Sequence, residues 1–420
     1  MLLDDLVSFF ALPSEQAEFM RQYKFSEAEK VYTDPPRGLT ADNILKRWHQ
    51  LNIPYDPVPL LDAAARALKC EYTKHLFHYL SYYWQCVDNA VVLGAGCKLP
   101  LWQKLKGRTE GMLLDLALAL DECNAIEKKF SELQIPEVYA YAAMQHIVED
   151  ITVYRKRFDL LGYGEFGHHW LRFFIEGKLF RIGRFEYWLQ DEVRNKSARF
   201  FRSKSNGSIA ALCPDNWLLD QEGLQLFTDV APEQAFMKSC LYEDEHCYRG
   251  TPVNPEGFAE VGKVISLNKN EYVPLWNSDS LVPDIHIPPG GNMSLEVCLS
   301  SLLEAREFFI RYFHKTPAAF TSFSWIFNPD FCQVAPQSNI SKFMQELYLM
   351  PLASGGLDGL EFVFGKASAD WADYPEDNSL RRAFHALRRN SRRLKSGGMV
   401  IEERGIENFG RKLYLTEYNF

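Results

Sequence analysis

The feature that most limits the fold of this chain is a change in the spacing of its apolar residues near Gly162. Before Gly162, apolar residues recur every three or four positions, as in 109–133 and 136–162, which is typical of amphipathic helices. After it, runs such as 178–190 alternate with a period of two and are rich in aromatic residues, as strands are. A chain of 420 residues is also long for one hydrophobic core. We therefore expect an α+β protein, with an all-α domain over 1–162 and an α/β domain with a mixed sheet over 163–420.

The second domain contains several recognisable elements. An Asn-Gly pair at 206–207 predicts a hairpin over 198–213. A short strand at 284–287 is followed by the corner Pro288-Pro289-Gly290-Gly291, and then by an amphipathic helix with Ser294 as its N-cap. Later segments favour strands at 318–327, 347–350, 360–365 and 399–403, and a basic helix at 378–394 that is capped by Gly397-Gly398.

Charge and cysteine usage exclude several classes of function. A formal net charge of -9 argues against a general nucleic-acid binder, because such binding depends on neutralising phosphates. The nine cysteines form no CxxC pair, which favours free thiols in a reducing compartment. No signal peptide and no apolar run of about 20 residues is evident, so we expect a cytoplasmic protein without a membrane span. The pair His168-His169 and the acidic segment 242–250 match no metal-ligand spacing, so we expect no metal.

The glycine corner, residues 288–291, has two interpretations. Glycines between a strand and a helix allow a ligand to approach the backbone, and free N–H groups at a helix start favour anions such as phosphates. A Pro-Pro-Gly-Gly sequence is equally suited to a rigid turn without a ligand. His286, at the end of the preceding strand, is a candidate general base, or a histidine that bonds a neighbouring carbonyl.

Two further sets of charged residues leave alternatives open. Glu186 shares a strand face with Arg184 and Trp188, so it is either a buried base with a raised pKa or half of an ion pair on a solvated face. The basic helix carries Arg381, Arg388 and Arg392 along one side. This side is either a solvated or docking face, or a contact for the phosphates of a ligand.

The chain resembles a bacterial family of acyltransferase-domain proteins at three segments that occur in this order: 284–313, 324–343 and 378–390. The resemblance implies a GNAT-like fold in the C-terminal domain and transfer of an acyl group from acyl-coenzyme A, as co-substrate, to an amine of a small acceptor. The family carries an Arg/Gln-x-x-Gly-x-Gly/Ala loop, whereas the corner here has glycines without arginine or glutamine. That departure motivates the alternative of an inactive GNAT-like protein that binds a ligand or a partner.

The hypothesis of an acyltransferase assigns roles to individual residues. His286, on the strand where several GNAT enzymes place a base, or Glu186 would remove the proton of the amine, and Tyr348, from its position on a later strand, would protonate the leaving thiolate. Abundant aromatic residues and scattered carboxylates leave a carbohydrate-active enzyme as a third hypothesis. The sequence leaves a homo-oligomer open. The residues that would receive coenzyme A are Ile287, Gly290, Gly291, Asn292, Met293 and Ser294.

Overall fold

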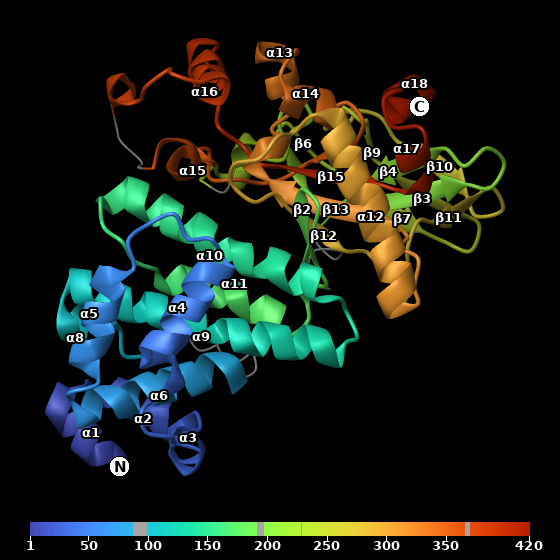
Figure 1. Cartoon of the computed structure of the whole chain (residues 1–420). Helices are drawn as coiled ribbons and strands as arrows, with labels where there is room; N and C mark the ends of the chain where they lie inside the picture. Colours follow the sequence, from blue (N-terminus) through green and yellow to red (C-terminus); the bar gives the residue numbers. More distant parts are fainter. Residues whose placement is uncertain (87–98, 191–196, 228, 366–369) are drawn as a thin grey trace. The chain divides into compact units, whose positions relative to one another are not determined.

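The computed structural model describes residues 1–86, 99–190, 197–227, 229–365 and 370–420. These residues form two compact units, Met1–Arg181 and Ile182–Phe420, which Figure 1 colours from blue to green and from green to red. The first unit is helical, and the second contains a mixed sheet with helices. The expected fold class, an all-α region followed by an α/β region, is confirmed.

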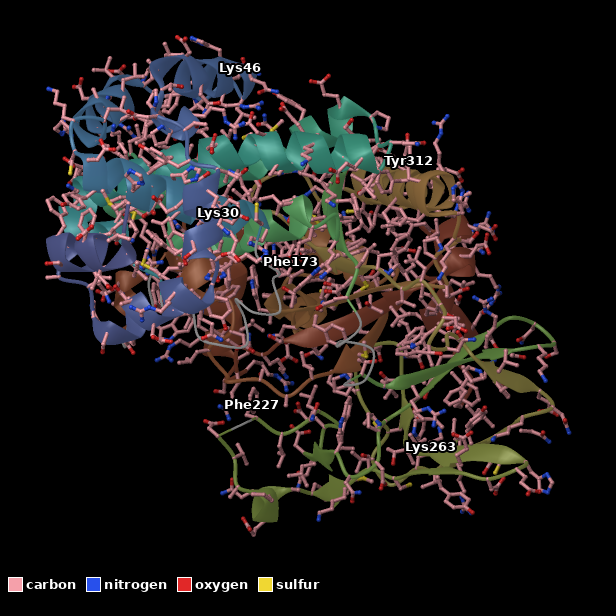
Figure 2. All side chains as sticks on the ribbon, turned by 90° about the horizontal axis from the view of Figure 1, so that it is seen from below. Lys30, Lys46, Phe173, Phe227, Lys263 and Tyr312 are labelled. Atoms are coloured by element: carbon pink, nitrogen blue, oxygen red, sulfur yellow. The ribbon has the colours of Figure 1, made fainter. Side chains whose placement is uncertain are left out.

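The long helix α9 (Arg108–Glu132) is the centre of the first unit. Its leucines are buried on several sides, because helices α4, α5, α6, α8, α10 and α11 all pack against it. Thr40 accepts a hydrogen bond from the backbone N–H of Asn43 at 3.3 Å and so caps α4. Figure 2 shows side chains filling the space between these helices, whereas the labelled Lys46 is exposed. The other helices of this unit are α1 (Leu3–Phe10), α2 (Ser14–Gln22), α3 (Phe25–Lys30), η1 (Arg37–Leu39), α4 (Ala41–Gln50), α5 (Val58–Ala67), α6 (Glu71–Cys86), α8 (Trp102–Lys106), α10 (Glu137–Phe158) and α11 (Glu165–Ile175).

A six-stranded mixed sheet is the framework of the second unit, and the boundary between the units falls within its edge strand β1. Strands β12 and β13 are parallel, whereas β2 pairs with β12, β13 with β15, and β15 with β14 in antiparallel fashion. The sheet is therefore mixed, as expected. The strands in spatial order are β1 (Leu179–Ile182), β2 (Phe185–Trp188), β12 (Asp284–His286), β13 (Phe320–Ser324), β15 (Gly397–Ile401) and β14 (Tyr348–Pro351).

Helix α12 (Leu295–Phe313) crosses one face of this sheet (Figure 1). Its buried Ser301 donates to the carbonyl of Ile182 at 2.6 Å and lies 3.0 Å from the hydroxyl of Tyr187. The ring of Tyr187 also packs edge-on against Phe309 of the helix. Since side chains alternate along a strand, the neighbours of Tyr187 on β2 point to the opposite face.

Three smaller antiparallel sheets complete the second unit. The predicted hairpin over 198–213 is confirmed, because β3 (Arg199–Ser203) and β4 (Ile209–Leu212) pair with Arg202 opposite Ile209. Their buried side chains share a core with β8 and β10, which includes Phe201 and Tyr248. The sheet orders are β11-β3-β4-β9, β10-β8-β7 and β5-β6, with β5 (Leu218–Leu219), β6 (Met237–Lys238), β7 (Leu241–Glu243), β8 (Cys247–Gly250), β9 (Pro252–Val253), β10 (Ile265–Asn268) and β11 (Tyr272–Pro274).

Two expectations for the last third of the chain are wrong. The segment 360–365 is not a strand but the short helix α15 (Leu360–Phe364), because Gly359 and Gly365 take positive φ at its two ends and Phe362 is 80 % exposed. Gly397 and Gly398 do not cap the basic helix α16 (Ser379–Arg389) but open strand β15, where a side chain at position 397 would collide with the carbonyl of Phe327. The remaining helices are η3 (Pro232–Gln234), η4 (Trp325–Phe327), α13 (Phe331–Val334), α14 (Asn339–Met344), η5 (Trp371–Asp373), α17 (Glu403–Glu407) and α18 (Leu413–Glu417).

The cysteines within the described residues form no disulfide bonds. The eight cysteines that the structure describes are free thiols, and Cys97 lies outside the described residues. Within those residues, no helix combines the length and the hydropathy needed to cross a membrane.

Candidate functional site

The register of β2 and β12 brings two of the predicted site residues together. Glu186 lies directly opposite His286 in the antiparallel pair. Directly opposed side chains share one face of a sheet, with Cβ atoms about 5 Å apart. This face is the one that α12 does not cover, because Tyr187, between Glu186 and Trp188, points to α12. The two candidate bases are therefore neighbours although 100 positions separate them in the sequence.

Glu186 is fully buried, whereas His286 is half-buried. The strand face that carries Glu186 is therefore not solvated, contrary to one of the two interpretations of this residue. The register places a carboxyl group and an imidazole on the same face of the inner part of the sheet. The roles assigned to these two residues remain predictions.

A third ionisable side chain on this face was not identified from the sequence. Asp284 precedes His286 by two positions and therefore points to the same side of β12. Burial raises the pKa of its carboxyl group from 3.8 to about 7, although Thr321 and Gln190 donate hydrogen bonds to it at 3.1 and 3.2 Å. A carboxyl group that titrates near neutrality is suited to general-base work. The i, i+2 spacing from His286 is the signal that could have found it.

The parallel strands β12 and β13 are in register at a single pair, Asp284 with Thr321. One step further along, the carbonyl of Ile285 accepts from the hydroxyl of Ser322 at 2.6 Å, where a continuing parallel ladder would use a backbone N–H. Strand β13 continues to Ser324 while paired with β15. Ligands of α/β proteins commonly bind beyond the carboxyl ends of parallel strands, which is where His286 ends β12.

The glycine corner follows this strand end directly. Gly290 and Gly291 both have positive φ, 74° and 67°, which side chains other than glycine rarely adopt. The guanidinium of Arg184, in the turn between β1 and β2, donates to the carbonyls of Pro288 at 2.9 Å and Gly290 at 2.7 Å. A Cβ on Gly291 would lie 3.1 Å from Nε of Arg184, so glycine allows this close approach. The corner thus has an arginine beside it, which the sequence could not show because it comes from 106 residues away.

The rest of the loop leads into the N-terminus of α12. The side-chain oxygen of Asn292 accepts from the backbone N–H of Ser294 at 3.0 Å and from Asn339 at 3.2 Å, which fixes the loop to α14. Ser294 is the N-cap residue, as predicted, although its side chain makes no capping hydrogen bond. The first-turn N–H groups of α12 are a favourable environment for an anion. Ile287 is half-buried and Met293 is buried, so both side chains help to pack the loop against the protein.

Tyr348 is not brought to the pair of Glu186 and His286. It lies on β14, and strands β13 and β15 separate it from β12. Its hydroxyl donates a short hydrogen bond to the carbonyl of Val253, and burial raises the pKa of the phenol well above its usual value. Its predicted role as an acid remains untested by this geometry.

The histidine pair that the sequence analysis considered for a metal belongs to the helical unit. Nδ1 of His168 lies 2.6 Å from Glu122, and both side chains are buried. Across the described ranges, no three or more His, Cys, Asp and Glu side chains gather in a group that could hold a metal ion.

Comparisons with known proteins place this geometry in a family. A family model described as "GNAT-like C-terminal domain" matches residues 179–406, which begins at β1 and includes every site residue named for the second unit. The comparison with curated proteins gives no match. The match confirms the resemblance that the sequence suggested for the C-terminal domain.

Solved structures show a similar fold over nearly the whole chain. An acyltransferase in complex with decanoyl-CoA has 18% sequence identity and a TM-score of 0.59, over 96% of this chain and 99% of the other. An acyltransferase in complex with decanoyl-CoA and teicoplanin has 16% identity and a TM-score of 0.58 over the same shares. At these identities the likeness concerns the fold. The family match, in contrast, covers more than half of the sequence. This protein belongs to the family of proteins with a GNAT-like C-terminal domain.

Proposed function

We propose that this protein is an acyltransferase that moves an acyl group from acyl-coenzyme A to an amine of a small acceptor. The observation that supports the proposal is the position of the glycine corner next to the candidate bases. The glycine corner and the N-terminus of α12 follow β12 at the end where Glu186, Asp284 and His286 share a face. A site for an anion therefore adjoins a group of candidate bases.

In the proposed reaction the amine nitrogen attacks the thioester carbonyl, a C–N bond forms and the C–S bond breaks. The proton of the amine goes to a base on the β2–β12 face and from there to the departing thiolate. Glu186 and His286 are the bases inferred from the sequence, and Asp284 is added because its pKa is about 7. The segment from Gly290 to Ser294 would receive the pyrophosphate of coenzyme A through its free backbone N–H groups, since the N–H of Ser294 already donates to Asn292.

The similar solved structures supply the first donors to try. They are described as acyltransferases in complex with decanoyl-CoA, and one of those complexes also contains teicoplanin. We infer that medium-chain acyl-coenzyme A is a suitable donor class and that the acceptor is a small molecule with an amine. The free cysteines support a location in a reducing compartment, which we propose to be the cytoplasm.

Release of coenzyme A thiol from decanoyl-CoA, followed with a thiol reagent over a panel of amines, tests the proposal. His286→Ala should lower turnover roughly 10²-fold, the usual scale for losing a general base. The exposed His246, replaced by Ala, serves as the matched control and should leave turnover unchanged. An unchanged rate in the His286 variant would remove that residue from the mechanism.

A second candidate is a GNAT-like protein that binds a ligand without catalysis. The absence of an Arg or Gln in the corner sequence 288–291 favours it. Thermal melting with free, octanoyl- and decanoyl-coenzyme A separates the two, because a ligand of the native state raises its stability. A stabilising shift without thiol release for any amine would favour the second candidate, and no shift at millimolar concentration would count against both.

A further inference from the structure

A cavity of about 790 Å³ lies in the connection between β14 and β15, away from the glycine corner in sequence. It is bounded by the C-terminal half of α16 and by the segment that starts at η5. We call it the arginine pocket. The lining residues that matter for the argument are Trp371, Glu376, His385, Arg388, Arg389 and Arg392.

The lining of the arginine pocket has a net positive charge, although the protein as a whole is acidic. This lining carries three arginines and one carboxylate, whereas the chain as a whole has a net charge of -9. Arg389 is paired with that carboxylate, since its Nη1 lies 3.0 Å from Glu376. Arg392 is paired with Glu222, outside the lining, at 2.8 Å. Two of the three positive charges are thus balanced by neighbours.

Arg388 is different. Its guanidinium carbon lies 5.0 Å from the centre of the Trp371 ring, at cation–π distance. In the part of the chain that the structure describes, no carboxylate lies within ion-pair distance of this exposed arginine. Trp371 is in turn packed edge-on against Tyr374 and His385, at 5.4 and 5.3 Å. Arg388 is therefore a positioned cation whose charge is left for a ligand.

A planar guanidinium held in this way is suited to a carboxylate or a phosphate, because its N–H groups match two oxygens at once. An anion beside Arg388 would supply the carboxylate or phosphate partner that Arg389 and Arg392 already have in Glu376 and Glu222. Arg388 was one of the arginines for which the sequence left a ligand contact open. Its contact with the Trp371 ring, and the lack of a carboxylate partner for it among the described residues, are the observations that support a ligand contact.

The arginine pocket and the proposed site for the donor lie on different connections of the sheet. Phe384 of α16 packs against Trp325 and Phe331, both at 5.7 Å, so the helix is seated next to the carboxyl end of β13. The proposed site for the pyrophosphate of the donor is a different loop, the corner after β12. Coenzyme A carries a 3′-phosphate besides its pyrophosphate, so a second anion site on a separate connection fits the donor or the acceptor, and the comparison with dephospho-coenzyme A described below distinguishes the two.

We propose that the arginine pocket binds an anionic group, carboxylate or phosphate, of the acyl acceptor. The acceptor would then carry a negative charge in addition to its reacting amine. The assignment of the anion to an acceptor rests on the proposed function, whereas the anion site itself does not depend on catalysis.

Binding of inorganic phosphate, measured by titration calorimetry in the presence of saturating coenzyme A, tests the anion site without catalysis. The wild type should bind phosphate, and Arg388→Gln should weaken this binding roughly tenfold or more, because it removes a charge-assisted contact. Arg388→Lys should recover part of it. Arg411→Gln, at an exposed arginine of the same unit whose guanidinium donates to the Asn408 side chain at 3.4 Å, is the matched control and should bind like the wild type. Equal phosphate binding by the wild type and the Arg388→Gln variant would overturn the proposal.

Two further comparisons determine whether the anion belongs to the donor or to the acceptor. Weaker binding of coenzyme A but not of dephospho-coenzyme A by Arg388→Gln would assign the pocket to the donor and overturn the acceptor proposal. In the thiol-release assay with octanoyl-CoA, phenylalanine and phenethylamine differ by one carboxylate, as do phosphoethanolamine and ethanolamine by one phosphate. The KM of the member that carries the carboxylate or phosphate should rise roughly tenfold in the Arg388→Gln variant, while that of the member without the anionic group is unchanged. Equal effects on both members contradict the proposal.

The two hypotheses fail in different ways. No thiol release with any amine contradicts the proposed acyltransferase function and, with it, the assignment of the anion to an acceptor. The phosphate titration would still show whether Arg388 is part of an anion site. A melting temperature of the Arg388→Gln variant close to that of the wild type shows that the variant is folded.

Discussion

Replacing Asp284 by Asn should remove a large part of the pH dependence of stability. The carboxyl group lies on the inner strand β12, where burial raises its pKa from 3.8 to about 7, and Thr321 and Gln190 only partly offset this by donating hydrogen bonds. The folded protein therefore holds the proton of Asp284 at pH values where the unfolded chain has lost it. Because the folded-state pKa is raised, the associated stability is fully present below about pH 4 and is lost as the pH rises through 7.

The size of the effect follows from the two pKa values. At about 1.4 kcal/mol for each pH unit, a shift from 3.8 to about 7 corresponds to a change of about 4 kcal/mol in the free energy of unfolding. About 2–3 kcal/mol of this falls between pH 5 and pH 8. Histidines also titrate in this range, so the effect of Asp284 is read from the difference between the variant and the wild type. Asparagine is neutral throughout and has no such dependence. The Asp284→Asn variant should therefore gain stability relative to the wild type as the pH increases.

Urea unfolding of both proteins at pH 5 and pH 8 measures this difference. The exposed Asp279, five positions earlier, provides the matched control, and its replacement by Asn should leave the difference between the two pH values unchanged. Glu186 and His286 share the face of Asp284, so the comparison is made between variants rather than from the wild type alone. A difference between Asp284→Asn and wild type that is the same at pH 5 and pH 8 would refute the raised pKa.

Three further substitutions test other parts of the second unit. Lys395→Met should cost about 3–5 kcal/mol in urea unfolding, because it leaves the buried carboxylate of Asp330 without the ammonium 2.8 Å away, and changing Asp330 to Leu as well should restore most of the loss. Tyr348→Phe should lower stability by about 1 kcal/mol through the lost bond to Val253, and a parallel fall in kcat would identify Tyr348 as the acid. Gly291→Val should diminish the thermal shift given by coenzyme A, since φ is 67° there; an unchanged shift would argue against a ligand at the corner.

Local patterns predicted the elements of this fold better than the contacts between them. The period of the apolar residues predicted the helical half, the Asn-Gly pair predicted the β3–β4 hairpin, and Ser294 was found at the N-cap of α12. The prediction of a strand at 360–365 was wrong because the apolar residues of this segment suit a buried strand, whereas glycines at both ends restrict it to one helical turn. Such conflicts are settled by backbone conformation rather than by composition.

The candidate site was predictable only where its residues are close in sequence. His286 and the glycine corner belong to one strand–loop–helix segment, so the sequence could propose them. The pairing of Glu186 with His286 and the approach of Arg184 to Gly290 each join residues about a hundred positions apart. The raised pKa of Asp284 depends on burial by the assembled sheet. These features arise from register and packing, which one sequence does not specify.

The pH dependence of stability and the pH dependence of kcat/KM together identify the base. If Asp284 accepts the proton of the amine, kcat/KM should rise as the pH increases through about 7, in step with the loss of folding stability from the same carboxylate. Asp284→Asn would then abolish both changes, while His286→Gln would lower the rate and keep the stability change. If His286 is the base, Asp284→Asn should alter the stability profile and leave the inflection of kcat/KM in place. Measuring both profiles for both variants decides between the two residues, because the wild-type profile of interacting groups does not say which of them accepts the proton.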